Sequence, residues 1–313
     1  MIRLRGASVA VALLVDALVG ELPEPMHPAV IMGRVVSRFE RRALTLEDAR
    51  QMRLAGLFLV VALPTLSFVL ARTTLRLAPP KLRGTFEVGL LSTTLSMRGL
   101  ARAALAVERQ LESDNLKAAR ARVGELVGRD TAHLSAGEVA RAAIESVAEN
   151  TSDGVVAPML YGLLWGAPGA FAYKAVNTLD SMVGHPQPPY RDLGWASARL
   201  DDLANLLPAR LTVLSAAVSA RRATTLTVAR RHGPLTRSPN AGWTEAAFAG
   251  ALNLELGGAN SYGGVLRQGP TLGSGRPPEA GDVRQAVRLM RRTCVLFAGL
   301  GLAASLARGC RGG

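Results

Sequence analysis

Apolar runs long enough to cross a membrane recur along the chain. Residues 54–71 (LAGLFLVVALPTLSFVLA) form an uncharged run of 18 residues, and residues 155–173 (VVAPMLYGLLWGAPGAFAY) form one of 19. A helix that spans about 30 Å of hydrocarbon needs about 20 mainly apolar residues. Weaker candidates, which are shorter or interrupted by a charge, are residues 6–20, 203–220 and 293–307. This pattern predicts an all-α, polytopic membrane protein with about four or five membrane segments.

The run at 155–173 contains residues that break a helix. Two prolines and three glycines interrupt it between Pro158 and Gly169, and the letters WGAPGA predict a turn between two short helices. Backbone that leaves helical geometry at membrane depth is tolerated where protein or a cavity covers it. We therefore expect this segment to be a re-entrant hairpin, so that the polar groups before and after it return to one face of the membrane.

Amphipathic and polar segments lie between these runs. A proline-rich stretch with His27 leads into a basic amphipathic helix from about Val30 to Arg42, which we expect at the membrane surface. Residues 86–107 are apolar with embedded charges and predict one amphipathic or bundle-lining helix. Residues 108–153 carry nine acidic and six basic side chains, so this segment is predicted to be mostly helical and outside the lipid.

Local signals refine this outline. Ser135 followed by Glu138 is a capping-box pattern that opens a helix running to about Glu149. Residues 257–281 are rich in Gly and Pro and predict a loop, and no segment has the alternation of a strand. Adjacent glycines at both ends of 257–264 predict a mobile lid, in which Gly263→Val should slow catalysis with little loss of stability. We treat residues 1–313 as a single membrane-embedded catalytic domain.

Composition and charge narrow the class of protein. A content of 49% hydrophobic and 19% charged residues favours a membrane protein over a soluble helical protein with two very apolar core helices. The net charge of +13 would suit nucleic acid. Arginines cluster instead beside apolar runs, at 221–237 and 284–292, as the positive-inside bias produces. We therefore expect the lipid bilayer as a partner, no nucleic acid, and a cytoplasmic position for these basic stretches.

The two cysteines and the N-terminal pattern do not change the predicted class of protein. Cys294 and Cys310 have no metal-ligand spacing and imply no disulfide framework. Arg3 and Arg5 precede an apolar stretch as in a secretory signal, but Asp16 interrupts that stretch. We interpret it as a retained membrane or interfacial segment.

The first polar constellation is ESVAENTSDG at residues 145–154. Glu145 and Glu149 are four residues apart and share a helix face, where two like charges disfavour an isolated helix. A cation or a cationic substrate group between them would relieve that repulsion, whereas the alternative is a solvated helix end. The residues at which we expect the helix to end are Asn150, Thr151, Ser152 and Asp153.

Two further constellations follow the run at 155–173. Asn177, Asp180 and Ser181 share a helix face, and an ionisable residue at membrane depth is a functional hypothesis by default. Asp201 and Asp202 offer hard oxygen ligands suited to Mg²⁺, which takes one or two carboxylates plus phosphate oxygens. Arg199, Asp202 and Asn205 recur at three-residue spacing, and the alternative for Arg199 and Asp202 is a structural ion pair.

A fourth constellation is SPNAGWTEA at residues 238–246, which contains Asn240 and Glu245 and is followed by a loop with Asn260 and Tyr262. The patterns GxxxxGK[ST], GxSxG, HExxH and CxxC are absent from the sequence. Any nucleotide would therefore be held by Mg²⁺ and arginines rather than by a P-loop.

Six stretches, in order along the chain, resemble one family. They are HPAVIMGRVV, VGRDTAHLS, ARAAIESVAENTSDGVVAPMLYG, AYKAVNTLDSMVGH, RDLGWASARLDDLANLLPARLT and SPNAGWTEAAFAGALNLELGGANSYGG. From about residue 12 to residue 265 the chain is similar to the adenosylcobinamide-phosphate synthase family of cobalamin biosynthesis proteins. One departure is Gly20-Glu21-Leu22, where the resemblance implies a Gly-Asp-Pro turn.

The resemblance implies an integral membrane enzyme with carbon–nitrogen ligase activity. Its substrates would be the corrinoid adenosylcobyric acid, through a carboxylate, and the amine of (R)-1-amino-2-propanol phosphate. ATP and Mg²⁺ are the implied cofactors, and an acyl phosphate is the expected intermediate because an unactivated carboxylate does not condense with an amine in water. The expected location is the inner cell membrane, with the active site facing the cytoplasm. The sequence leaves open the choice between aminopropanol phosphate and ethanolamine phosphate, and the oligomeric state.

The candidate site residues fall into three groups. The catalytic candidates are Glu145, Glu149, Asn150, Asp153, Asp180, Arg199 and Asp202. The substrate-binding candidates are Arg129, Asp130, Thr131, Ser152, Asn177, Ser181, Asn205, Asn240, Glu245, Asn260 and Tyr262. The candidate Mg²⁺ ligands are Asp201, Asp202, Glu149 and Asp153. Arg129 and Arg199 would neutralise phosphate charge, and Glu149 or Asp180 would accept the amine proton.

Two other classes of protein remain open. A transporter would line a substrate path with buried carboxylates and broken helices, but it predicts two halves of similar hydropathy, which the sequence does not have. A corrinoid-binding membrane protein without ligase activity would need the apolar surface but not the carboxylate clusters.

Overall fold

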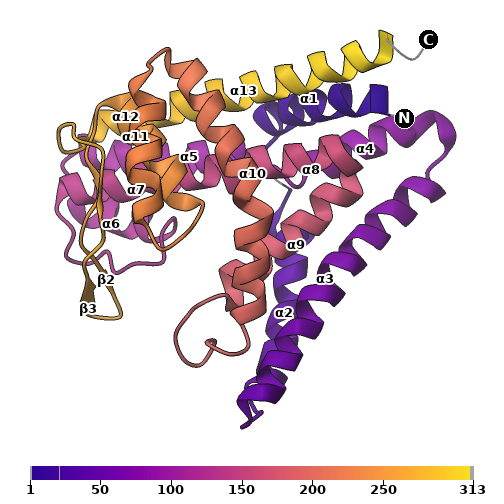
Figure 1. Ribbon diagram of the computed structural model, residues 1–313, viewed down its shortest axis with the longest axis horizontal. Coiled ribbons are helices and arrows are strands. Elements are labelled where there is room, and N and C mark those ends of the chain that lie inside the picture. The colour runs from indigo at the N-terminus through magenta and orange to yellow at the C-terminus, as the bar shows by residue number, and fades with distance from the viewer. Residues whose placement is uncertain (1, 21, 311–313) are drawn as a thin grey trace. The chain divides into compact units, whose positions relative to one another are not determined.

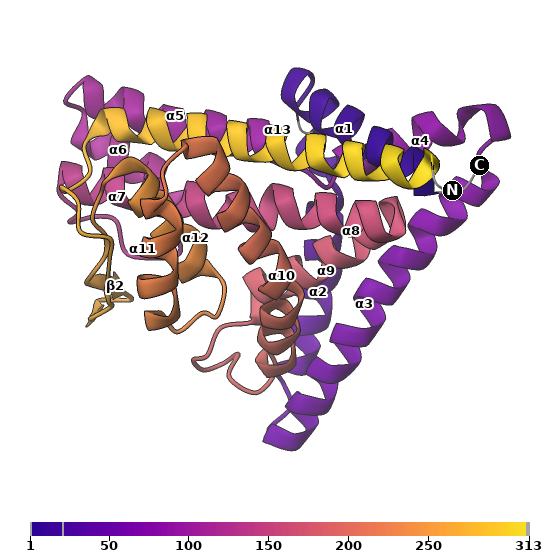
Figure 2. The same cartoon turned by 45° about the horizontal axis from the view of Figure 1, so that its top comes forward.

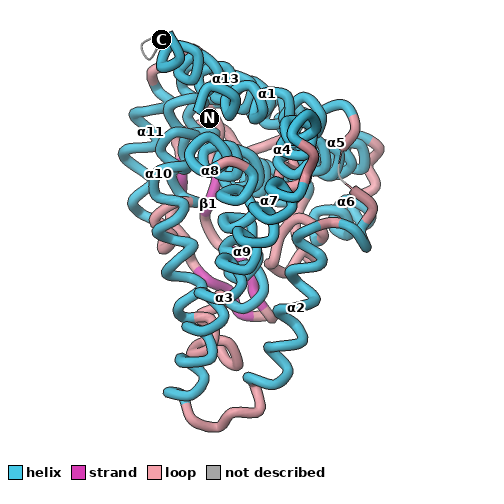
Figure 3. Tube along the Cα trace, turned by 90° about the vertical axis from the view of Figure 1, so that its right-hand side faces the viewer, coloured by secondary structure: helices cyan, strands magenta, loops and turns pink. Residues whose placement is uncertain are grey.

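A computed structural model describes residues 2–20 and 22–310 (Figure 1). Helices dominate the described chain, which confirms the predicted helical class, and strands are confined to short segments near one another in sequence (Figure 3). These strands correct the expectation of a plain loop at 257–281. They are β1 (Leu256–Gly257), β2 (Asn260–Tyr262), β3 (Val265–Arg267) and β4 (Thr271–Leu272).

The chain divides into two compact units, each assembled from separate stretches. Unit 1 consists of Met1–Ser96, Ala157–Asn205 and Ala298–Gly313. Unit 2 consists of Met97–Val156 and Leu206–Phe297. The single catalytic domain expected for residues 1–313 stays a prediction, because compactness alone does not test which parts act together.

Unit 1 is built mainly from long helices. Its elements are α1 (Ile2–Leu18), η1 (Glu24–Met26), α2 (Pro28–Ala43), α3 (Ala49–Leu77), η2 (Pro80–Leu82), α4 (Arg83–Ser92), α8 (Ala157–Trp165), α9 (Ala167–Val183), the first part of α10 (Trp195–Ala220) and the last part of α13 (Ala280–Cys310).

The predicted helix from Val30 to Arg42 is confirmed as α2. It begins at Pro28, where the missing amide costs nothing, and His27 caps it by accepting the Ala29 amide at 3.3 Å.

The core of unit 1 lies where α2, α3 and α9 meet. Val36 from α2, Leu63 from α3 and Leu179 from α9 are buried together. The opposite face of α3 remains apolar and exposed, with Phe58 at 63% and Val61 at 66% exposure. An apolar helix face without a protein partner is suited to lipid.

The break predicted within residues 155–173 is confirmed. The chain ends α8 at Trp165, turns at Gly166 and resumes as α9 at Ala167. Gly166 has φ +75°, which side chains other than glycine rarely adopt, and Glu87 accepts the Ala167 amide at 2.7 Å. The two helices then pack on each other through stacked Tyr161 and Tyr173 rings with centroids 5.0 Å apart. The segment is therefore a helical hairpin.

Unit 2 is built from shorter helices around α7. Its elements are α5 (Met97–Glu112), α6 (Leu116–Gly124), α7 (Ala136–Thr151), a π-helical turn (Ser152–Val156), α11 (Thr224–His232), η4 (Gly233–Leu235), α12 (Ala241–Leu252), β1 to β4, and the remaining parts of α10 and α13. Figure 2 shows α11 and α12 packed side by side. The strands form two antiparallel pairs, β1 with β4 and β2 with β3.

Small side chains let the neighbours of α7 approach closely. Ala140, Ala143 and Val147 are fully buried, and α7 packs against both α5 and α12. The predicted capping box is confirmed, since the Ser135 hydroxyl accepts the Glu138 amide at 3.3 Å and Glu138 accepts the Ser135 amide at 2.8 Å. This cap fixes where α7 starts and therefore which residues of α7 face each neighbour.

Two predicted elements differ from the structure. Residues 86–107 belong to two helices, α4 and α5, because 93–96 interrupt them. The helix that contains Glu145 and Glu149 ends at Thr151, within the expected residues 150–153, but the chain stays helical through the π-helical turn 152–156 into α8. The departure at Gly20-Glu21-Leu22 includes Glu21, which lies outside the described residues.

Within residues 2–20 and 22–310, three helices are long and apolar enough to cross a membrane. They are α3, α10 and the stretch Ala280–Ala307 of α13, and they contain the predicted runs 54–71, 203–220 and 293–307. The run 155–173 is split at Gly166, and α1, which contains most of 6–20, has 17 residues. The count of four or five membrane segments is not confirmed.

Candidate active site

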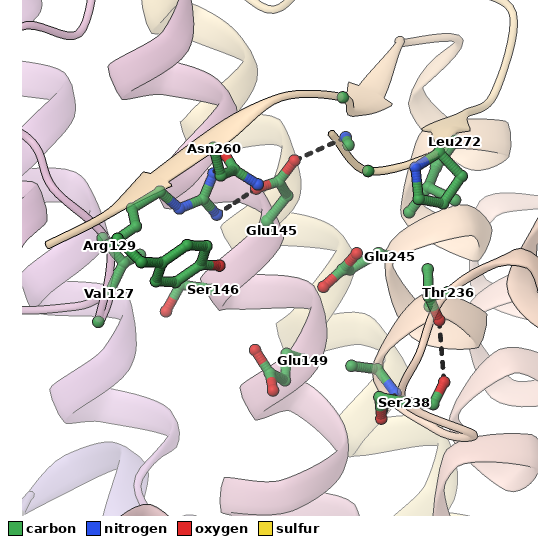
Figure 4. Close-up of a pocket in the computed structure, with 18 of the residues that line it drawn as sticks. Val127, Arg129, Glu145, Ser146, Glu149, Thr236, Ser238, Glu245, Asn260 and Leu272 are labelled. Atoms are coloured by element: carbon green, nitrogen blue, oxygen red, sulfur yellow. Dashed lines mark hydrogen bonds and ion pairs between the residues drawn. The ribbon is translucent and has the colours of Figure 1, made fainter. Parts of the chain in front are cut away.

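A polar pocket of about 360 Å³ lies within unit 2. Its walls come from α7, the start of α12, and the segments 126–129, 236–238 and 257–272 (Figure 4). Three carboxylates, those of Glu145, Glu149 and Glu245, face this pocket, and one arginine, Arg129, lies beside them. The structure thus brings together candidates from two of the four sequence constellations, the first and the fourth, and adds Arg129.

Glu145 and Glu149 reach the pocket because they lie one turn apart on α7. Glu145 is almost fully buried, whereas Glu149 is exposed to the pocket. The prediction that they share a face is confirmed. The cation expected between like charges is supplied for Glu145 by the protein itself, through Arg129.

Arg129 and Glu145 form a buried ion pair that also fixes the adjacent loop. Their side chains are 9% and 5% exposed, and Arg129 donates to both Glu145 and the Asn260 side-chain oxygen, the latter at 2.5 Å. Glu145 in turn accepts the Gly257 amide at 2.7 Å. Burial alone would lower the pKa of Arg129, but the Glu145 carboxylate outweighs it and raises that pKa. In this structure the Arg129 guanidinium therefore binds Glu145 and Asn260, whereas the sequence suggested that it would bind phosphate.

Glu245 enters the pocket from the first turns of α12. Protein surrounds it, yet part of the side chain remains accessible from the pocket. Burial, followed by the charges of Glu145 and Glu149, raises the pKa of Glu245 well above its usual range, while Arg129 acts in the opposite direction. A cation in the pocket would act in the same direction as Arg129 and favour the ionised carboxylate.

Asp130 does not line the pocket but anchors the β2–β3 hairpin beside it. Its carboxylate accepts the Ser261 hydroxyl at 2.6 Å and the amides of Gly263 and Gly264 at 3.1 and 2.8 Å. The Ser261 hydroxyl and the Gly264 amide lower the pKa of Asp130. Gly263 has φ +59°, so the expectation that Gly263→Val leaves stability intact is wrong, because a β-branched residue is strained there.

Several contributors to the pocket were not expected from the sequence. Arg141 donates to the Ala259 carbonyl and the Asn260 side chain, at 3.0 and 3.1 Å. Thr236 and Ser238 line the wall beside α12, and Ser238 caps that helix by accepting the Ala241 amide at 3.1 Å. Helical spacing carries a signal for Arg141, which lies four residues before Glu145, but none of these contacts could be read from local sequence.

A second carboxylate group lies in unit 1. Asp201 and Asn205 face each other on α10, with the Asn205 amide donating to Asp201 at 2.9 Å and the Tyr173 hydroxyl donating to Asn205 at 2.8 Å. Asn177 and Asp180 of α9 interact with Asp201 as well. Arg199 and Asp202 lie 3.8 Å apart at the surface, which fits the structural pair.

The remaining candidates lie outside the pocket lining. Asn150 donates to the Ser146 carbonyl at 3.0 Å, Ser181 to the Asn177 carbonyl at 2.8 Å, and Asn240 accepts Arg210 at 2.8 Å. Ser152 is buried in the π-helical turn beside Asp153, and Thr131 packs near Gly124.

The four candidate Mg²⁺ ligands divide between the units. Glu149 and Asp153 belong to unit 2, whereas Asp201 and Asp202 belong to unit 1. In the described chain, no group of three or more His, Cys, Asp or Glu side chains is arranged to hold a metal ion. Glu149 and Glu245 nevertheless supply two hard oxygen donors facing one pocket, which suits Mg²⁺ that takes its other ligands from a phosphate and water.

Fold and pocket together define a helical protein with membrane-type helices and a carboxylate-lined pocket. The chain belongs to the CobD/Cbib protein family, whose model matches residues 9–290, and this confirms the resemblance. It is 43% identical to the cobalamin biosynthesis protein CobD of Chromobacterium violaceum, over 95% of each chain. It is 40% identical to that of Brucella anthropi, over 95% of this chain and 96% of the relative, and 41% identical to that of Klebsiella pneumoniae, over 90% and 91%. No solved structure matches the chain.

Proposed function

We propose that this protein acts in cobalamin biosynthesis as an ATP-dependent carbon–nitrogen ligase. It would join a carboxylate of adenosylcobyric acid to the amine of (R)-1-amino-2-propanol phosphate and release adenosylcobinamide phosphate. Membership of the CobD/Cbib family supports the pathway. The observation that carries the reaction type is the acidic pocket of unit 2, where Glu149 and Glu245 face a space that suits an ammonium group.

The size of the pocket favours the amine substrate over the corrinoid. A volume of about 360 Å³ is near the lower end of the roughly 300–1,000 Å³ typical of small-molecule sites. An amino-alcohol phosphate fits such a volume, whereas a corrin macrocycle does not. The corrinoid would therefore remain outside the pocket and present only its carboxylate-bearing side chain.

Glu149 is the proposed proton acceptor. The amine enters as an ammonium and gives one proton to Glu149, which frees the nitrogen lone pair. That lone pair forms the C–N bond with the acyl carbon, the phosphate leaves with the C–O electron pair, and the second proton passes to solvent. Glu245, in its ionised form, stabilises the ammonium before that first proton transfer, and Arg129 holds Glu145 and Asn260 in place.

ATP and Mg²⁺ complete the proposal. ATP would activate the corrinoid carboxylate as an acyl phosphate, because a free carboxylate is unreactive toward amines. Mg²⁺ would neutralise phosphate charge, with Asp153 as its candidate ligand in unit 2. Asp180, Asp201 and Asp202 of unit 1 are proposed to serve a second phosphate-bound cation.

The proposed setting is the inner cell membrane, with four or five membrane segments and the active site facing the cytoplasm, where ATP is available. α3, α10 and α13 support three of these segments. The α8–α9 hairpin would be the re-entrant one.

Purified protein supplied with adenosylcobyric acid, aminopropanol phosphate, ATP and Mg²⁺ tests the function. We expect adenosylcobinamide phosphate to form and ATP to be consumed in step with it, with product detected by mass spectrometry. Corrinoid binding without amide formation would support a binding protein instead. ATP-independent uptake of corrinoid into vesicles would support a transporter.

A further inference from the structure

A second groove in unit 2 is lined by arginines rather than by carboxylates. It has a volume of about 210 Å³ and lies between the C-terminal end of α10, the C-terminal end of α12 and the first turns of α13. Its polar walls are Arg222, Arg288, Arg292 and Gln285. Leu289 and Leu252 form its apolar part. The lining contains no acidic residue.

The arginines come from two separate parts of the chain that meet at the groove. Arg288 and Arg292 lie four residues apart and so share one face of α13. Arg222 donates to the Ala251 carbonyl at 3.3 Å, which fixes it at the end of α12. Arg288 also attracts Glu108, but Arg284 contacts that carboxylate directly at 3.0 Å. Three cations around one small groove repel one another, and an anion between them would relieve that repulsion.

The groove lies where two membrane-type helices change from charged to apolar. The apolar part of α10 ends at Ala220, which lines the groove, and the apolar run of α13 begins at residue 293, directly after Arg292. Val218 and Val295 flank these points and are 64% and 61% exposed. Basic groups followed at once by exposed apolar side chains match the order of phosphate and acyl chains in a phospholipid.

We propose that this groove binds the phosphate headgroup of an anionic phospholipid, with the acyl chains along Val218 and Val295. A soluble phosphate would use the same arginines but would gain nothing from the exposed valines. The site is separate from the acidic pocket, and its test does not depend on the proposed ligase activity.

Lipid binding by purified, detergent-solubilised protein tests the proposal. Phosphatidylglycerol should bind and raise the unfolding temperature, whereas phosphatidylcholine should not. Arg288→Gln with Arg292→Gln should weaken phosphatidylglycerol binding by about 30-fold. Each basic residue near an anionic lipid surface contributes about 1 kcal/mol to binding, and the loss of two such contributions corresponds to that fold-change. Arg291→Gln is the matched control, because Arg291 is exposed on the same helix but does not line the groove.

Native mass spectrometry of retained lipid provides a second readout, and Arg222→Gln a second variant if the double variant does not fold. Selective loss of bound phosphatidylglycerol in the groove variants supports the site. Equal loss in Arg291→Gln would overturn it. A shift of the same size with inorganic phosphate alone, with no added effect of lipid, would overturn the lipid as the source of the phosphate.

Discussion

Glu149 and Glu245 are the residues on which the proposed chemistry depends most. They come from different helices, α7 and α12, and both face the acidic pocket. Glu149 is exposed, and part of the Glu245 side chain is accessible from the pocket. A change that keeps their shape and removes their charge should therefore affect turnover more than folding.

Glu149→Gln, and in unit 1 Asp202→Asn, should abolish ligation while membrane insertion and yield stay normal. Loss of a general base alone corresponds to a decrease of about 10²- to 10⁴-fold in turnover. Glu125→Gln, at an exposed carboxylate outside the pocket, serves as the control. Loss of folded protein, rather than of activity, would assign either residue a structural role.

The raised pKa of Glu245 predicts a dependence on pH. Bound ammonium favours the ionised carboxyl, so the KM for aminopropanol phosphate should fall as pH rises through this pKa. The folded state also keeps a proton that the unfolded state releases above about 4.5, so the free energy of unfolding should fall as pH rises toward the folded-state pKa. Glu245→Gln should flatten both dependences, measured by kinetics and thermal unfolding from pH 4.5 upward. Unchanged profiles would show that another group titrates.

The Arg129–Glu145 pair should be a structural requirement of the pocket. Glu145→Gln leaves a buried guanidinium without its counter-charge, which costs about 3–5 kcal/mol in unfolding free energy. Combining it with Arg129→Gln should recover part of that loss, as measured in a double-mutant cycle. Strictly additive losses would mean that the two side chains are not coupled.

At the scale of elements, the β2–β3 hairpin contributes to the pocket wall through Asn260 and Tyr262. Asp130 pins its turn, and Arg129 and Arg141 hold Asn260 at its start. The mobile lid expected over residues 257–264 stays a prediction. For this segment to open, the hydrogen bonds between it and Asp130, Arg129 and Arg141 would have to break.

Gly263→Val should destabilise the protein by about 1–2 kcal/mol, because φ +59° is unfavourable for a side chain with a branched β-carbon. Gly263→Asn should cost much less, because asparagine tolerates this conformation and no atom lies within 4 Å of an added Cβ. Thermal unfolding compares the variants. Limited proteolysis with and without substrates tests the lid, and cleavage of this loop that substrates leave unchanged would contradict closure.

At the scale of the whole molecule, the topology of the membrane segments is the decisive question. If the α8–α9 hairpin is re-entrant, the chain before and after it faces the cytoplasm. Ser113 in unit 2 and Gln187 in unit 1 are exposed, which makes both positions suitable for cysteine labelling.

Single cysteines at Ser113 and Gln187, in a background lacking Cys294 and Cys310, should react with a membrane-impermeant thiol reagent in inside-out vesicles. Neither should react in right-side-out vesicles. Labelling of the two positions from opposite sides would contradict the re-entrant hairpin.

The sequence by itself determined the helical class, the position of the apolar helices, the capping box at Ser135 and the break at Gly166. Each depends on residues near one another in the chain, through hydrophobic periodicity, hydrogen bonding of a cap, or the conformational freedom of glycine. Sequence also placed Glu145 and Glu149 on one face, because helical spacing is local.

Only the tertiary structure decided which distant residues those side chains contact. Arg129 lies 16 residues before Glu145 and 131 before Asn260, so no local pattern could show that it pairs with both rather than with phosphate. Glu245 is nearly 100 residues from Glu149, and its raised pKa arises from burial and from charges on another helix. The basic groove likewise needs α10, α12 and α13 to meet. Charge and burial depend on neighbours in space, and folding alone selects those neighbours.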